Sequence, residues 1–212
     1  MLAEGRVGEL RSSSGATRET RLGSYSELIC NDTGFGRYFE AARLGRSFLT
    51  NVVAFAQVAA NATALAATTQ FIVGFSNPIG SGKAAVITRA SEQTRSGTPA
   101  GPLYLTGGVT SAAISSAATG TVVNTSFGAG SAMIARNNVA LTGFVVTGNT
   151  FQVPIGGPAA VAAGAGVYSS DIEFAGQIII PPGGVCGILG SGVGTTHIVD
   201  CAMYWVEVDW PL

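Results

Sequence analysis

The side chains best suited to chemistry are one histidine, two pairs of acids and a lysine in a glycine-rich loop. His197 is the only histidine and stands three residues before Asp200. Residues i and i+3 of a strand point to opposite faces, so this pair does not suit the relay that activates a nucleophile. The sequence therefore favours a strand-end histidine without a catalytic role.

The acid pairs are Asp171 with Glu173, and Glu207 with Asp209. In a strand each pair shares one face and could supply two ligands to a divalent ion, but no third ligand converges on either pair in the sequence. The alternative is that they are solvated strand edges, or charges that oppose edge-to-edge pairing. We favour that alternative and predict no metal or cofactor.

The loop 77–85 (NPIGSGKAA) resembles part of a phosphate-binding loop because it ends in Gly82 and Lys83 after an apolar run. The full signature has Gly five residues before Gly82 and Ser or Thr after the lysine. This chain has Asn77 and Ala84 at those positions. Without the hydroxyl that would hold Mg²⁺, the segment predicts a hairpin loop with one solvated lysine.

Polysaccharide cleavage is only weakly supported by composition. It would need two carboxylates in a cleft that is normally rich in aromatics, whereas residues 51–212 hold six acids and two tryptophans, both near the end of the sequence. We therefore predict that the protein is not an enzyme.

Cysteine content indicates no zinc site. Cys30, Cys186 and Cys201 are an odd number at wide spacings, without CxxC pairs. We expect buried, reduced thiols in a protein made in a cytosol. A disulfide between Cys186 and Cys201 is the alternative.

The distribution of charge divides the chain. Residues 1–50 hold 13 of the 23 charged side chains, whereas residues 96–170 hold one, Arg136. Charged residues make up 11% of the sequence, against roughly 25% in an average soluble domain. A monomer usually needs interspersed charges to resist association. The sequence therefore predicts a subunit whose surface is largely covered by neighbours.

The elements that would position these residues fall into two predicted parts. Residues 1–50 read as an extended N-terminal arm, because 11–24 have no apolar periodicity. A short strand is expected within 25–32. A short helix is possible within 35–48, placing Tyr38, Phe39, Ala42 and Arg43 on one turn and ending near Gly45.

Residues 51–212 are predicted to form a β-sandwich body. Segment 52–69 is ambiguous and favours a strand followed by an irregular loop. Short strand-like runs then recur at spacings of roughly 8 to 12 residues between Gly and Pro, which is typical of a sandwich or barrel. A jelly roll is the expected arrangement. These runs are 69–78, 84–91, 101–107, 120–128, 139–148, 150–156, 166–176, 176–189 and 197–210.

The run 197–210 has apolar residues on both faces. One face of the strand would carry Val199, Cys201, Met203, Trp205 and Glu207. The other face would carry Asp200, Ala202, Tyr204, Val206 and Val208. This pattern predicts a strand that is buried on two sides or lies at a subunit interface.

Net charge and hydropathy argue against two classes of partner, nucleic acids and membranes. A formal net charge of −1 gives no long-range field for nucleic acid or anionic membrane. No apolar run approaches the roughly 18 residues of a spanning helix, and the first residues lack the pattern of a secretory signal. We expect neither a nucleic-acid nor a membrane partner.

Three segments resemble structural proteins of tailed bacteriophages. They are 178–208 (IIIPPGGVCGILGSGVGTTHIVDCAMYWVEV), 75–91 (FSNPIGSGKAAVITRAS) and 36–48 (GRYFEAARLGRSF). They are similar to head-associated jelly-roll proteins of the decoration or cement type, and the resemblance as a whole extends over about half of the chain. The resemblance implies trimers on the exterior of a capsid, made in the host cytoplasm, and no catalysis. It transfers no functional residue.

Two function classes follow. The first is a capsid decoration protein, a homotrimer that binds the major capsid protein. The second is a head-fibre, tail-fibre or adsorption module that binds a host surface glycan; a cellular carbohydrate-binding module or enzyme ranks below both. For the first class we predict that Arg37, Tyr38, Phe39 and Arg43 anchor the protein on its partner. The alternative is that this cluster packs internally, with Tyr38 and Phe39 capping the open end of the sandwich.

Overall fold

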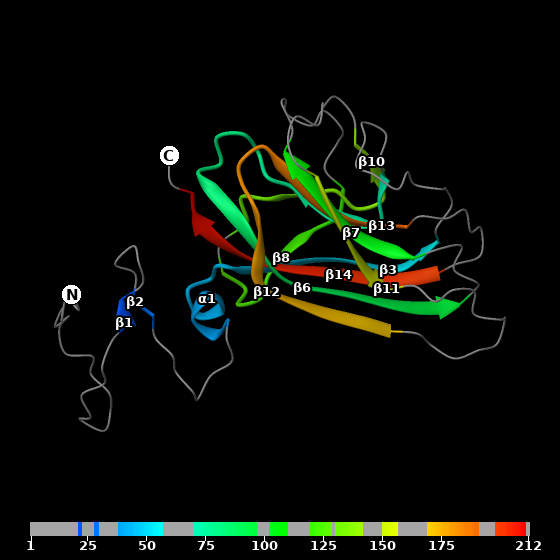
Figure 1. Ribbon diagram of the computed structural model, residues 1–212, viewed down its shortest axis with the longest axis horizontal. Coiled ribbons are helices and arrows are strands. Elements are labelled where there is room, and N and C mark those ends of the chain that lie inside the picture. The colour runs from blue at the N-terminus through cyan, green and yellow to red at the C-terminus, as the bar shows by residue number, and fades with distance from the viewer. Residues whose placement is uncertain are drawn as a thin grey trace, which may run out of the picture. The chain divides into compact units, whose positions relative to one another are not determined.

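Antiparallel strands make up nearly all the regular structure in the computed structural model (Figure 1). It describes residues 21–22, 28–29, 38–56, 70–96, 102–109, 119–128, 130–141, 150–156, 169–190 and 198–210. The chain divides into two units, Met1–Arg37 and Tyr38–Leu212. In the first, β1 (Arg21–Leu22) pairs with β2 (Leu28–Ile29), which lies inside the strand expected at 25–32. Most of the predicted arm lies outside the described residues.

The second unit begins with the one described helix, α1 (Phe39–Arg43), followed by β3 (Ser47–Ala56). The predicted boundary at residue 50 therefore falls inside a strand of the body. The described part of the chain contains no helix with the length and apolar character needed to cross a membrane.

One five-stranded sheet has the order β12-β6-β14-β3-β8. Its remaining strands are β6 (Lys83–Ser96), β8 (Val122–Asn124), β12 (Ser169–Ile180) and β14 (Ile198–Asp209). In Figure 1, β12, β6, β14 and β3 run lengthwise through the lower part of the body. All pairings in this sheet are antiparallel.

The second five-stranded sheet has the order β11-β7-β13-β5-β9. Its strands are β5 (Val73–Ser76), β7 (Leu103–Val109), β9 (Ile134–Ala135), β11 (Phe151–Gly156) and β13 (Gly184–Gly190). A separate ribbon pairs β4 (Gln70–Phe71) with β10 (Val139–Ala140). The all-β prediction is confirmed, with two antiparallel sheets as a sandwich requires.

The core lies between the two sheets and is centred on Trp205 of β14. Trp205 is fully buried, and its ring lies 6.2 Å from that of Phe48 on β3 and 4.7 Å from that of Phe75 on β5. Val199, Cys201 and Met203 are also buried, as the period-2 pattern predicts. The other face of β14 is only partly covered within the chain, since Tyr204 is half-buried and Val208 exposed; the alternative of a subunit interface stays a prediction.

Strand β12 unites two runs that the sequence divides at Gly176. Ala175 and Gly176 have φ of 50° and 78°, and the pairing of β12 with β6 shifts between Glu173 and Ile178. An irregularity of this kind absorbs extra residues while the strand keeps the same partner. The break predicted from the glycine is therefore a bulge.

The central strand β13 of the second sheet is buried on both faces, because two paired glycines let an aromatic ring lie on the outer side of the sheet. Added at Gly74 or Gly187, paired on β5 and β13, a Cβ would lie 2.6 Å and 2.5 Å from Cδ2 of Phe71. On the core face, a Cβ added at Gly107 beside Cys186 would lie 2.6 Å from Cε1 of Phe151. Every residue of β13 is buried in consequence.

Buried Asn77 ties together two of the connections that cross between the sheets. Its side-chain amide donates to the carbonyl of Lys83 (2.8 Å) and to that of Ile180 (3.1 Å). Its backbone N donates to the carbonyl of Gly184 (2.8 Å), and its own carbonyl accepts from the N of Gly183 (2.9 Å). The predicted hairpin at 77–85 is therefore wrong: the loop passes from β5 in one sheet to β6 in the other.

Candidate functional site

Helix α1 and the turn after it form the corner of the body that carries the predicted anchor residues. The N of Ala42 donates to the carbonyl of Tyr38 (3.0 Å), and the N of Gly45 to the carbonyl of Ala42 (2.9 Å). Gly45 has a φ of 68°, which glycine adopts without a steric penalty and which ends the helix. The predicted helix and its stop at Gly45 are confirmed.

The four anchor candidates do not share one environment. Arg37 lies outside the described residues, as does the side chain of Phe39. Tyr38 is half-buried, and its hydroxyl is buried without a hydrogen-bond partner. Arg43 is exposed in the last turn of α1. Arg43 is thus accessible to a partner, while Tyr38 packs partly within its own chain.

A turn after β8 packs against this corner and is fixed by the buried side chain of Asn124. Its Nδ2 donates to the carbonyl of Gly45 (2.7 Å), and its Oδ1 accepts from the N (2.9 Å) and Oγ (2.7 Å) of Ser126. The N of Thr125 donates to the carbonyl of Ser47 (2.9 Å). The turn is therefore bonded both internally and to the segment that joins α1 to β3.

Phe127 lies in this turn, and sequence reasoning missed it. Its side chain is 91% exposed. The sequence reading assigns it to the end of the strand run 120–128, whereas β8 stops at Asn124. The run NTSFG holds the residue types typical of turns around the phenylalanine. That composition was the available signal for an aromatic in a turn.

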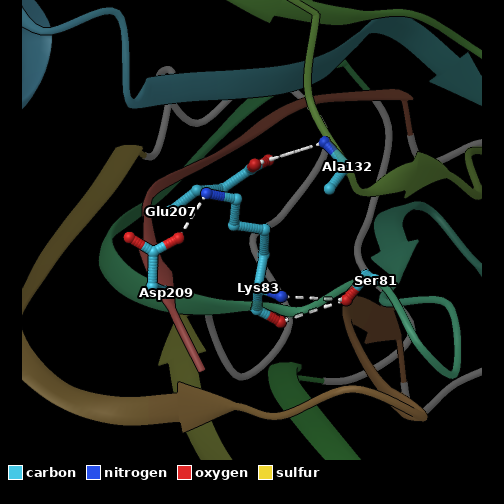
Figure 2. A network of polar contacts seen from close by, with 5 residues as sticks. All are labelled: Ser81, Lys83, Ala132, Glu207 and Asp209. Atoms are coloured by element: carbon cyan, nitrogen blue, oxygen red, sulfur yellow. Dashed lines mark hydrogen bonds and ion pairs between the residues drawn. The ribbon is translucent and has the colours of Figure 1, made fainter. Parts of the chain in front are cut away.

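The acids Glu207 and Asp209, predicted to be a solvated pair, lie in opposite environments (Figure 2). Glu207 is 6% exposed; its carboxylate accepts from Ser131 Oγ and from the N of Ala132 (3.2 Å), with Trp205 Nε1 at 3.4 Å. Asp209 is exposed and pairs with Lys83 Nζ at 2.5 Å. The hydrogen bond from Lys83 holds the pKa of Asp209 below its usual value.

We predict that Glu207→Ala destabilises the body whereas Asp209→Ala changes its stability little. Removing Glu207 leaves the Ser131 hydroxyl and the Ala132 N–H without their acceptor, which costs about 1 to 3 kcal/mol. Asp209 forms an exposed ion pair, and such pairs contribute little. Urea denaturation of the two variants measures the difference. An equal loss of stability in the two variants would show that the buried hydrogen bonds of Glu207 do not account for the effect.

The glycine-rich loop uses its polar groups internally. Ser81 Oγ donates to Asn77 Oδ1 (2.7 Å). It also accepts from the N of Lys83 (3.2 Å), a contact that Figure 2 shows. Gly80 and Gly82 have φ of 81° and 65°. Lys83, expected to be solvated, has a side chain that is exposed and pairs with Asp209 at the surface.

A second buried acid, Glu92, lies toward the other end of β6. Its side chain is 3% exposed, and neither carboxylate oxygen has a hydrogen-bond partner. Ser170 on β12 and Cys201 on β14 flank it in the sheet, and a Cβ added at Gly156 of β11 would lie 2.5 Å from its Oε1. Burial raises the pKa of Glu92 to about 7.

The other candidates from the sequence are held in structural contacts. Asp200 pairs with Arg95 at 2.6 Å, while His197 lies outside the described residues. Asp171 pairs with Arg89, whose guanidinium also lies 5.3 Å from the ring centre of Tyr204. Within the described ranges, no three His, Cys, Asp or Glu side chains are grouped to hold a metal ion.

Cys186 and Cys201 are free thiols on β13 and β14, so the alternative of a disulfide between them is wrong. Burial raises the pKa of both thiols, and buried thiols are poor nucleophiles. Cys30 lies outside the described residues.

Arg136, the one charged residue of segment 96–170, is buried. It is 4% exposed, its Nε donates to Ser76 Oγ (2.9 Å), and its backbone N donates to the carbonyl of Gly74 (2.8 Å). Burial lowers the pKa of its guanidinium. The described exposed residues of this segment therefore carry no formal charge.

Comparison with protein-family models, with curated proteins and with solved structures found no match.

Proposed function

We propose that the protein is a structural component of a bacteriophage virion, which decorates and stabilises the capsid by binding the coat-protein shell as a symmetric oligomer. The observation that carries the proposal is the absence of charge from the exposed residues that the structure describes in segment 96–170. The one charge of that segment, Arg136, is 4% exposed and bonded inside the body. A surface without charge is poorly suited to a free monomer and well suited to contact between subunits.

The order of the strands supports a jelly roll as the fold of this component. Eight of the strands are divided equally between the two five-stranded sheets. Their orders are β12-β6-β14-β3 in one sheet and β11-β7-β13-β5 in the other. Jelly rolls are built in this way and serve in viral capsids and in lectins. Function does not follow from fold alone, so this likeness adds to the argument from surface charge.

The mechanism is thermodynamic. A protein that binds only the assembled shell stabilises it by mass action, in proportion to the logarithm of its concentration over its dissociation constant. Such a protein needs an adhesive surface and no catalytic group. The residues that could do chemistry fit this role, because Glu207, Asp171 and Asp200 are each held in contacts within the body.

Copy number separates this function from the adsorption module. Quantitative mass spectrometry of virions whose genome encodes the chain would give its ratio to the major capsid protein. Hundreds of copies per particle support decoration. A few copies would instead support a fibre or adsorption module, and absence from the particle would refute both.

We expect Arg37→Ala with Arg43→Ala to weaken binding to intact particles by at least about thirtyfold, because truncating an arginine anchor commonly costs about 2 kcal/mol. Cosedimentation with particles measures the affinity. Arg95→Ala is the matched control, since Arg95 is an exposed arginine on β6 that pairs with Asp200. Normal binding by the double variant, or its failure to fold, would rule out the anchoring role.

A further inference from the structure

Phe127 combines exposure with backbone strain. Of the large apolar side chains among the described residues, it is the most exposed, at 91%. Its φ of 56° lies in the left-handed region, which bulky side chains rarely adopt. Such strain persists only where the surrounding structure enforces it, and it concentrates at functional positions.

The turn that holds Phe127 is firmly bonded, so the ring projects from a rigid support. The N of Phe127 donates to the carbonyl of Asn124 (3.0 Å), and Asn124 itself is 8% exposed. The turn also packs on Gly45, because a Cβ added there would lie 3.7 Å from Ser126 Oγ. A rigid aromatic loses little conformational entropy when it becomes buried at an interface.

The surface around Phe127 indicates what it contacts. The other exposed residues described between 119 and 130 are small and uncharged: Gly120, Thr121, Thr125, Ser126, Gly128 and Gly130. Arg43 and Arg46 flank Gly45 in the sequence and supply positive charge on one border of this surface. A partner that placed charged groups against the uncharged part of this surface would remove water from those charges without forming ion pairs in return.

We propose that the turn 124–128 is a self-association contact, in which the Phe127 ring is buried against the uncharged surface of a second copy of this chain. The chain itself offers such a surface, because the described exposed residues of 96–170 carry no charge. The inference rests on the proposed function in one respect, since that function includes a symmetric oligomer. It adds the surface and the residue through which the oligomer forms.

The test is sedimentation equilibrium of the full chain with Phe127→Asn. Asparagine accepts a left-handed backbone better than phenylalanine does, so the variant should fold at least as stably as the wild type. Loss of the ring should raise the dissociation constant of the oligomer at least about thirtyfold. Phe127→Tyr keeps a ring and should associate like the wild type.

Val53→Thr is the matched control, since Val53 is 59% exposed on β3 and threonine keeps its shape; it should leave the mass unchanged. If Phe127→Asn melts lower than the wild type, Phe127→Gly supplies the same measurement in a backbone that tolerates any φ. A wild-type mass in these variants, or a monomeric wild type, overturns the inference. An oligomer that requires Phe127 but binds no particle refutes the proposed function alone.

Discussion

Replacing Gly187 with alanine is expected to destabilise the body by about 3 kcal/mol or more, an overpacking cost at the upper end of the usual range. The new Cβ would lie 2.5 Å from Cδ2 and 2.7 Å from Cδ1 of Phe71. The ring cannot readily move aside, because it is fully buried and also covers Gly74. Chemical denaturation of the variant gives the loss directly.

Two further variants test the cause. Gly130→Ala is the matched control, because nothing lies within 4 Å of a Cβ at that position, and its stability should be close to that of the wild type. Phe71→Leu in the Gly187→Ala background should recover part of the loss, so that the double-mutant cycle is strongly non-additive. Additive effects would show that the ring over Gly187 is not the source.

Stability is expected to fall as pH rises from about 4.5 to about 7, owing to Glu92. The pKa of Glu92 is raised from 4.5 in the unfolded chain to about 7 in the folded one. Between these values the unfolded chain ionises while the folded chain stays protonated. The free energy of unfolding therefore decreases, by about 3 kcal/mol in total. For a chain of this size that corresponds to about 6 to 12 °C in melting temperature.

Glu92→Gln should remove this dependence, because glutamine stays neutral at every pH. Melting curves of both proteins from pH 4.5 to 8 give the comparison. Cys201 is the titratable side chain that flanks Glu92 among the described residues, and its raised pKa keeps it neutral throughout. Asp209 has a lowered pKa and titrates below this window. A wild type whose stability is constant across the window would contradict the assignment.

Alternation was sufficient to predict the final strand and its buried face, because both depend on neighbours in the sequence. The alternation along 197–210 predicts the burial of Val199 and Trp205 on β14. The glycine at position 45 likewise predicts the end of α1. Both features are encoded within a few residues and are therefore readable without a structure.

The contacts that decide burial of charge could not be predicted, because their partners are distant in the sequence. Glu207 is buried against Ser131 and Ala132, about 75 residues earlier. Glu92 lies beneath Gly156 of a strand in the other sheet. The loop 77–85 has the composition of a hairpin, and the crossing between sheets becomes evident only from the contacts of Asn77. For these positions, spacing carries no information on tertiary neighbours.

Strand β14 occupies the centre of its sheet, hydrogen-bonded to β6 on one side and β3 on the other. It is also the last strand along the sequence. During synthesis, β3 and β6 thus emerge from the ribosome long before the strand that must separate them, and until then each presents an unpaired edge. Such edges invite pairing with other nascent chains. The sheet can therefore close around Trp205 only after β14 has been synthesised.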